Sequence, residues 1–269
     1  MTPDFLYRNT GGSPDIAYTD SGGQAGHAVV LLHSLGTDHR IWADTAAALA
    51  TEYRVLVPDS RGHGESQWDG YLTCDDWVTD LDGVLDHAGV RSAALVGVSM
   101  GGVQSIAYAA HHRGRVAALV VADSFAELDP EVARAKTAGL AERARNDGMA
   151  ALADFYVSST FTVDPLPATA ESVRAAIASM DPDAYVASTE TCFGVRLGDA
   201  LGRIESPALV LWGERDAKTP RDLSEHIARD ISGATLEVVP DAGHLSNAEN
   251  PEAFTALVRK FLADYTSGK

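Results

Sequence analysis

The stretch ALVGVSMGGVQSIAYAAHH, residues 94–112, decides the fold of this chain. Its first part is an apolar run that ends at Val98, and its last part has the Ala-rich character of a helix. Between them stands Ser99, with Gly97 two residues before it and Gly101 two residues after it. A sharp turn from a strand into a helix needs small residues at these two positions, because it brings their backbones against the sheet and the helix. The stretch therefore predicts a buried strand, a sharp turn that carries a serine hydroxyl, and a helix.

Similar apolar runs alternate with Ala-rich helical segments along most of the chain, which is typical of a mostly parallel sheet flanked by helices. Buried strands are predicted at 29–33, 54–58, 93–98, 116–122, 208–212 and 235–239. Two earlier segments, 5–8 and 16–19, are predicted as antiparallel edge strands, with the Gly-Gly pairs at 11 and 22 supplying turns. The pattern thus predicts an α/β fold with an eight-stranded, mostly parallel sheet.

The alternation stops between residues 126 and 200, where no convincing buried strand occurs. Helical stretches at 131–145, 170–180 and 184–192 are separated there by the turn signals DPLP and DPD. We therefore predict a first part of the core at 1–125, a helical cap inserted after the sixth strand at 126–200, and a second part of the core at 201–269. A last helix is predicted at 251–265, because Asn250 and Pro251 are good helix-start residues.

Composition excludes several classes of function. The 269 residues, 45% of them hydrophobic, fit one domain with an insertion. The net charge of −17 argues against nucleic acid or an anionic membrane as a partner, because Lys and Arg make most phosphate contacts.

No stretch approaches the roughly 20 apolar residues that span a bilayer, and the first residues lack a basic start and an apolar run, so we expect a cytoplasmic protein. Cys74 and Cys192 are expected to be free thiols, and no metal or organic cofactor is expected.

A serine hydroxyl attacks a carbonyl when a base removes its proton. We expect that base to be His244, in a glycine-containing loop after the last predicted strand, because catalytic groups collect beyond the carboxyl ends of parallel strands. The base needs an acid that orients it. Asp216 follows the next-to-last strand and fits the chain order serine, acid, histidine, whereas Asp123 ends the strand before it and is the alternative acid. The sequence predicts a triad of Ser99, His244 and Asp216.

The same chemistry needs two backbone N–H groups that hold the negative charge formed on the carbonyl oxygen. We expect one from Met100, the residue after the serine, and the other from Leu35, in the loop after the strand at 29–33. Ser34 is the second candidate in that loop.

These motifs together resemble the α/β-hydrolase superfamily over the whole length of the chain. The matching blocks are LLHSLGTDHRIW at 31–42, VPDSRGHGES at 57–66, GVSMGG at 97–102, LVLWGERDAKTP at 209–220 and DAGHLSNAENP at 241–251. Within the superfamily the chain is most similar to 3-oxoadipate enol-lactonases of bacterial aromatic catabolism, which carry similar SLGTD, RGHG, SMGG and GHLSN-x-E-x-P segments. The resemblance implies an α/β-hydrolase fold and a serine hydrolase that cleaves a carboxylic ester or lactone through an acyl-serine intermediate.

The sequence departs from the enol-lactonase pattern at two places. Such lactonases usually have Asn at the position of His33, and they have a Cys-x-Ala-x-Arg-Asp-like stretch where this chain reads ETCFGVRLGD at 190–199. Arg196, inside that stretch, is a candidate for binding a substrate carboxylate, because a guanidinium can hold a carboxylate with two hydrogen bonds. Ser34 is a second candidate for substrate contact.

Other functions stay open on the same triad. Acyl transfer, perhydrolysis, hydrolysis of a C–C bond, and ligand binding as a receptor with little turnover are alternatives. Haloalkane dehalogenase and epoxide hydrolase chemistry is disfavoured, because those relatives use an Asp nucleophile and position 99 is Ser. We expect a small-molecule ester or lactone as the partner, and the sequence leaves homo-oligomer formation open.

Overall fold

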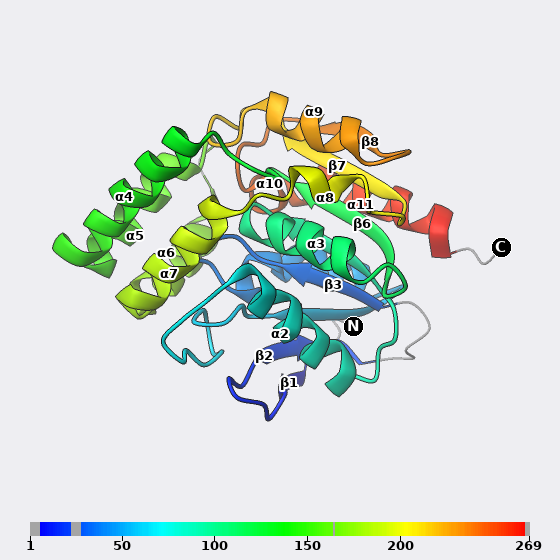
Figure 1. Ribbon diagram of the computed structural model, residues 1–269, viewed down its shortest axis with the longest axis horizontal. Helices are drawn as coiled ribbons and strands as arrows, with labels where there is room; N and C mark the ends of the chain where they lie inside the picture. The colour runs from blue at the N-terminus through cyan, green and yellow to red at the C-terminus, as the bar shows by residue number, and fades with distance from the viewer. Residues whose placement is uncertain (1–5, 23–27, 164, 267–269) are drawn as a thin grey trace.

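The computed structural model describes residues 6–22, 28–163 and 165–266, and it confirms the predicted fold class. One eight-stranded sheet runs in the order β1-β2-β4-β3-β5-β6-β7-β8 (Figure 1). The strands β3 to β8 pair in parallel. At one end of the strand order, β2 pairs antiparallel with β4, and β1 pairs antiparallel with β2. The strand bounds are β1 Leu6–Asn9, β2 Ala17–Asp20, β3 Ala28–Leu32, β4 Arg54–Pro58, β5 Ala93–Val98, β6 Val116–Ala122, β7 Ala208–Gly213 and β8 Thr235–Val239.

The predicted strands agree with the observed ones to within one residue at each end, among the residues that the structure describes. Of the predicted edge-strand and turn residues, Phe5 and Gly23 lie outside the described part of the chain. One expectation is wrong, since β8 is not buried on both faces. Thr235 and Glu237 are exposed, because β8 is the last strand of the sheet and one of its faces meets solvent there.

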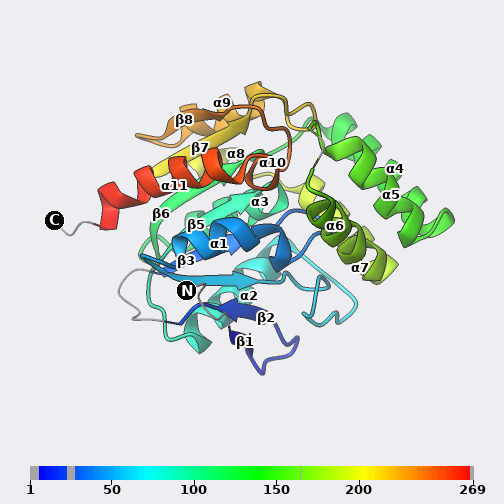
Figure 2. The same cartoon turned by 180° about the vertical axis from the view of Figure 1, so that it is seen from behind.

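Helices cover both faces of the sheet. One face carries α1 (Ala43–Leu49) and α11 (Pro251–Thr266), which pack against each other (Figure 2). The other face carries α2 (Cys74–His87), α3 (Met100–His111), α8 (Gly198–Leu201) and α9 (Arg221–Asp230), with α3 packed on β3, β5 and β6 (Figure 1). Because both faces are covered, β3 and β5 are buried along their whole length, as near-continuous apolar strands require.

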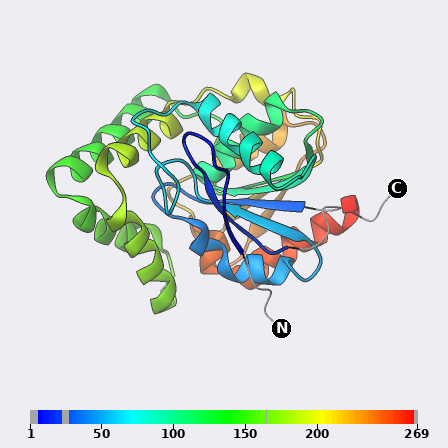
Figure 3. The same cartoon turned by 90° about the horizontal axis from the view of Figure 1, so that it is seen from below.

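After β6 and before β7, four of the helices stand together beside the carboxyl edge of the sheet (Figure 3). They are α4 (Pro130–Asn146), α5 (Met149–Thr160), α6 (Pro167–Ser179) and α7 (Pro182–Gly194), with α4 packed on α7 and α5 on α6. Three of them match predicted helical stretches, and α5 was not predicted. Its second half is rich in aromatic, β-branched and hydroxyl residues of low helix propensity, so packing against α6 decides its structure.

The end of the four-helix segment differs from the predicted boundary. The predicted boundary at residue 200 falls inside α8, which packs on α3 and α9. Two short helices, the 3-10 helix η1 (His39–Trp42) and α10 (Ser246–Glu249), follow β3 and β8. In the part of the chain that the structure describes, no helix combines the length and apolar character that crossing a membrane requires.

Candidate active site

The predicted site residues gather at one edge of the sheet. Because β3, β5, β6, β7 and β8 run in parallel, their carboxyl ends meet at the same edge. Leu35 follows β3, Ser99 follows β5, Asp123 follows β6, Asp216 follows β7 and His244 follows β8. The carboxyl edge of a parallel sheet is where α/β proteins build their sites.

Ser99 stands on a strained turn between β5 and α3. Its backbone has φ 54° and ψ −115°, a conformation that residues with a side chain rarely adopt. The turn closes only with glycine on both sides: a Cβ at Gly97 would overlap the carbonyl of Gly101, and a Cβ at Gly101 would overlap the carbonyl of Leu32. The Ser99 amide donates to the Ala122 carbonyl at 2.9 Å, which ties the turn to β6. The predicted sharp turn is therefore present and rigidly held.

The imidazole of His244 lies between the serine and one carboxylate. His244 Nε2 is 3.0 Å from Ser99 Oγ, and His244 Nδ1 is 3.0 Å from Asp216 Oδ2. All three side chains are buried. A neutral imidazole with Nδ1 protonated donates to Asp216 and accepts the Ser99 proton at Nε2, which is the arrangement that general-base catalysis requires.

Asp216 is held by the segment that follows it. Its Oδ1 accepts hydrogen bonds from the amides of Lys218 at 2.7 Å and Thr219 at 3.1 Å, and the Thr219 hydroxyl donates to Oδ2. Burial alone would raise the pKa of Asp216, but the positive charge that His244 can carry and the hydrogen bonds from His244 and Thr219 hold it below its usual value. Asp216 therefore stays ionised and can stabilise an imidazolium. Sequence reasoning did not find Thr219, although it lies in the quoted block at 209–220.

Asp123, the alternative acid, has different partners. Its Oδ1 accepts from the Gly213 amide at 2.7 Å, and its Oδ2 is bonded to the amide and hydroxyl of Ser246. Burial and the charge of Asp216 raise the pKa of Asp123 well above its usual value. Within the described residues, its oxygens accept hydrogen bonds from the last residue of β7 and from Ser246 in the loop after His244. They have no hydrogen bond to the imidazole.

The two predicted N–H donors of the oxyanion hole are free to bind a ligand. Leu35 and Met100 are buried, and among the described residues their amides have no hydrogen-bond partner. Two histidines hold the loop of Leu35 from both sides. His33 Nδ1 is 2.8 Å from the Ser34 carbonyl, and the Gly36 amide donates to His63 Nε2 at 3.2 Å. Two such amide donors match what a tetrahedral intermediate needs.

A cavity of about 280 Å³ opens above the serine. Ser99, His244 and Leu35 lie at its base, and side chains from α4, α5 and α7 form its walls. The predicted substrate contact Ser34 lines it, and its hydroxyl is 3.3 Å from the hydroxyl of Tyr156. Tyr156 comes from α5, the helix that the sequence pattern did not reveal, so this residue was missed.

Arg196 does not lie where a substrate contact would need to be. Its side chain is exposed and its guanidinium donates to the neighbouring Val195 carbonyl at 2.8 Å, and it does not line the cavity. The cations that do line the cavity are Lys136, Arg143 and Lys218. The backbone of Arg196 forms an isolated antiparallel bridge with Glu127, just before the first of the four helices.

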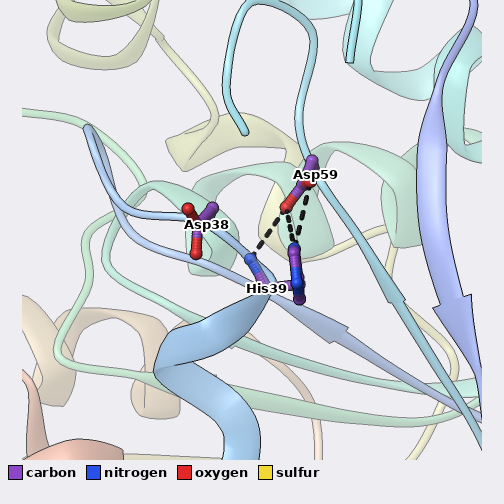
Figure 4. A group of neighbouring side chains, drawn as sticks. All are labelled: Asp38, His39 and Asp59. Atoms are coloured by element: carbon purple, nitrogen blue, oxygen red, sulfur yellow. Dashed lines mark hydrogen bonds and ion pairs between the residues drawn. The ribbon is translucent and has the colours of Figure 1, made fainter. Parts of the chain in front are cut away.

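A separate cluster of Asp38, His39 and Asp59 has the residue types of a metal site (Figure 4). Its ligand atoms already bind one another and their neighbours. Asp38 holds the Arg40 guanidinium, and Asp59 accepts hydrogen bonds from the His39 amide at 2.8 Å and the Tyr7 hydroxyl at 3.0 Å. His39 Nδ1 lies 2.9 Å from Asp59 (Figure 4). These groups are satisfied as an ion-pair network, and the expectation that no metal is needed stays a prediction.

Comparisons with known proteins agree with this geometry. A family described as the alpha/beta hydrolase fold matches residues 27–251. The chain is 29% identical to 3-oxoadipate enol-lactonase 2 of Acinetobacter baylyi over 95% of its own length and 97% of that protein. Its structure is similar to an enol-lactonase from Burkholderia xenovorans, with a TM-score of 0.88, 32% identity, and coverage of 96% and 100%. A thermophilic esterase from Thermogutta terrifontis gives a TM-score of 0.85 at 31% identity, with coverage of 98% and 100%. The chain belongs to the α/β-hydrolase fold family.

Proposed function

We propose that this chain is a serine hydrolase that cleaves a carboxylic ester or lactone. One observation carries the proposal: Ser99, His244 and Asp216 are joined by contacts of 3.0 Å each and lie at a cavity. The amides of Leu35 and Met100, which have no hydrogen-bond partner among the described residues, belong to the same site. The names of the enol-lactonases and the esterase that the chain resembles describe the same reaction class, and this supports the proposal.

In this mechanism Ser99 Oγ attacks the carbonyl carbon while His244 Nε2 takes its proton. The amides of Leu35 and Met100 stabilise the oxyanion that forms. The imidazolium then gives the proton to the departing alkoxide, and an acyl-serine remains. Water, deprotonated by His244, hydrolyses the acyl group and restores the serine hydroxyl.

The segment 126–200 acts in this proposal as a cap that encloses the substrate, because its helices supply the walls of the cavity. The core segments 1–125 and 201–269 supply the reacting groups. A cytoplasmic location is part of the same proposal, and it is supported by the free thiols Cys74 and Cys192, which suit a reducing compartment. The partner is a small-molecule ester or lactone.

The test is Ser99→Ala on 4-nitrophenyl acetate. We expect kcat to fall by roughly four to six orders of magnitude, with an unchanged circular dichroism spectrum. Ser206→Ala is the matched control, since this buried serine comes just before β7, at the opposite edge of the sheet. Near-normal turnover by the Ser99 variant would refute the assignment.

The same assay separates the enzyme from a receptor on this fold. An enzyme releases many equivalents of 4-nitrophenolate for each active site, and a receptor stops near one equivalent. Adding an alcohol as acceptor and identifying the products distinguishes hydrolysis from acyl transfer, and peroxide as acceptor tests perhydrolysis.

A further inference from the structure

The charge of the cavity is opposite to the charge of the protein. The chain has 38 acidic and 21 basic side chains, for a net charge of −17. Yet the described residues that line the cavity include Lys136, Arg143 and Lys218 and not one carboxylate. Lysine is scarce here, and two of the four lysines in the chain stand at this cavity. Such a local excess of positive charge predicts a negatively charged ligand.

The two lysines lie close together and face the same space. Lys136, on α4, has its Nζ 3.3 Å from the carbonyl of Lys218 and 6.0 Å from the ring centroid of Phe193. Lys218 has its Nζ 3.4 Å from Ser159 Oγ and 5.0 Å from the ring centroid of Tyr156. Both side chains are half-buried. The Lys136 ammonium thus contacts a carbonyl and an aromatic ring, and the Lys218 ammonium contacts a hydroxyl and an aromatic ring.

Neither lysine has a carboxylate partner in the described part of the chain, whereas the third cation does. Arg143 pairs with Asp147 at 3.7 Å and stacks on the ring of Phe155 at 3.9 Å. Asp216 is only two residues from Lys218, but its oxygens are taken by His244, Thr219 and the Lys218 amide. The two ammonium groups therefore have no direct ion-pair partner among the described residues.

The surroundings of Lys218 shift its pKa. Burial lowers the pKa of Lys218, the charge of Lys136 lowers it further, and the opposing effect of Asp216 leaves it at about 8. Two neighbouring positive charges repel each other, and a bound anion relieves this repulsion. Apolar side chains, including Phe125, Leu140 and Phe155, also line the cavity.

We propose that Lys136 and Lys218 form a binding site for an anionic group of the substrate, so that the enzyme prefers esters or lactones that carry a carboxylate beyond an apolar segment. The inference rests on the proposed function, because the carboxylate is placed relative to an ester bond at Ser99. It replaces the predicted contact Arg196, which is exposed and does not line the cavity, with two lysines that do line it.

The test uses pairs of substrates that differ only in charge. Mono-4-nitrophenyl esters of straight-chain dicarboxylic acids of five to nine carbons are compared at pH 7 with the same molecules capped as methyl esters. We expect the anionic member to have at least a tenfold higher kcat/KM at the best chain length, mainly through a lower KM, because a charge-assisted contact forms on binding.

Lys136→Met and Lys218→Met should each reduce this preference roughly five- to tenfold, and the double variant should abolish it. Lys136→Arg should keep it, and Lys136→Glu should reverse it. Arg196→Met is the matched control, because it removes an exposed cation outside the cavity and should leave the preference unchanged. All variants are compared on the capped ester, which reports catalysis without the anion.

A pH series gives a readout that a purely structural role would not move. The groups facing the Lys218 ammonium are Lys136 from α4, Tyr156 and Ser159 from α5, and Asp216 from its own loop. Burial raises the pKa of Tyr156 to about 12, so it stays neutral over the range tested. The preference for the anionic ester should fall as the pH rises through about 8, and in Lys136→Met this fall should move to higher pH.

The outcomes separate the two proposals. Equal rates on charged and capped esters, or a preference that survives in the double lysine variant, would overturn the anion site while the hydrolase stands. Loss of the preference in Arg196→Met alone would return the site to that residue. Activity of Ser99→Ala on both esters would overturn the proposed function itself.

Discussion

At the scale of single residues, two neighbouring carboxylates serve different partners. Asp216 faces His244 Nδ1 at 3.0 Å and is kept ionised, whereas Asp123 is buried among Gly213 and Ser246 and has a strongly raised pKa. Asp123 Oδ2 accepts hydrogen bonds from the amide and the hydroxyl of Ser246, two residues after the histidine, so Asp123 supports the histidine loop without contacting the imidazole. The two residues are 93 positions apart in sequence, and nothing local to either one distinguishes their roles.

Two Asn substitutions test this division. Asp216→Asn should lower kcat/KM by about three to four orders of magnitude, because the amide cannot stabilise the imidazolium or fix its tautomer. Asp123→Asn, its matched control, keeps a side chain of the same shape away from the imidazole and should cost at most about tenfold in rate and about 1–3 kcal/mol in unfolding free energy. Steady-state kinetics and urea denaturation measure both. A normal rate in Asp216→Asn with an inactive Asp123→Asn would transfer the acid role to Asp123.

At the scale of elements, the loop after β3 depends on the turn after β4. The Gly36 amide, next to Leu35, donates to His63 Nε2, while His63 Nδ1 lies 3.1 Å from the Arg61 carbonyl. Burial, with a smaller effect from the charge that His33 can carry, lowers the pKa of His63 to about 3, so the ring is neutral at working pH and can accept this hydrogen bond. The turn that carries His63, which the sequence showed only as part of the matching block at 57–66, thus holds the loop of Leu35 in position.

His63→Leu removes the acceptor for the Gly36 amide and should loosen the loop. We expect kcat to fall roughly ten- to one hundredfold with a much smaller change in KM, because the oxyanion contact strengthens only in the transition state. His63→Gln, whose side-chain oxygen can accept the same hydrogen bond, should restore part of kcat. If both variants lose only thermal stability and keep kcat, His63 has no role in positioning the loop.

At the scale of the whole molecule, Asp59 ties together parts of the chain that are far apart in sequence. It receives the Tyr7 hydroxyl from β1, the His39 amide and ring from η1, and the Glu65 amide from the turn that carries His63. Burial alone would raise the pKa of Asp59, but the hydrogen bond and charge of His39, with the Glu65 amide, lower it to about 2. The edge of the sheet is therefore linked to the oxyanion loop through one ionised carboxylate.

This link predicts a pH-dependent stability. Because the folded pKa of Asp59 is about 2 and the ordinary value is 3.8, its charge stabilises the fold above about pH 4, and this is lost as the pH falls through about 2. Asp59→Asn should therefore lower the unfolding free energy by about 2 kcal/mol at pH 6, and the difference from the parent should shrink toward pH 2. Asp154→Asn, at an exposed ion pair with Arg174, should leave the unfolding free energy nearly unchanged. A difference that stays constant from pH 6 to pH 2, measured by urea denaturation, would contradict this prediction.

Much of the framework could be predicted from the sequence. The period of the apolar runs and the glycines beside Ser99 define the strands and the sharp turn, because these depend on backbone geometry and neighbours a few residues away. The prediction that β8 is buried on both faces is wrong, and the pattern does not predict α5. Both features depend on which other elements pack against the segment.

The sequence by itself determined the sheet, the order of the strands that carry Ser99, Asp216 and His244, and the chemistry that such an order permits. Only the tertiary structure decided which aspartate faces the imidazole and which side chains surround the substrate. Lys136 and Lys218 are 82 residues apart and meet only because the α4–α7 helices fold back over the carboxyl edge of the sheet. That meeting is set by long-range packing between helices, and no local pattern of residues encodes it.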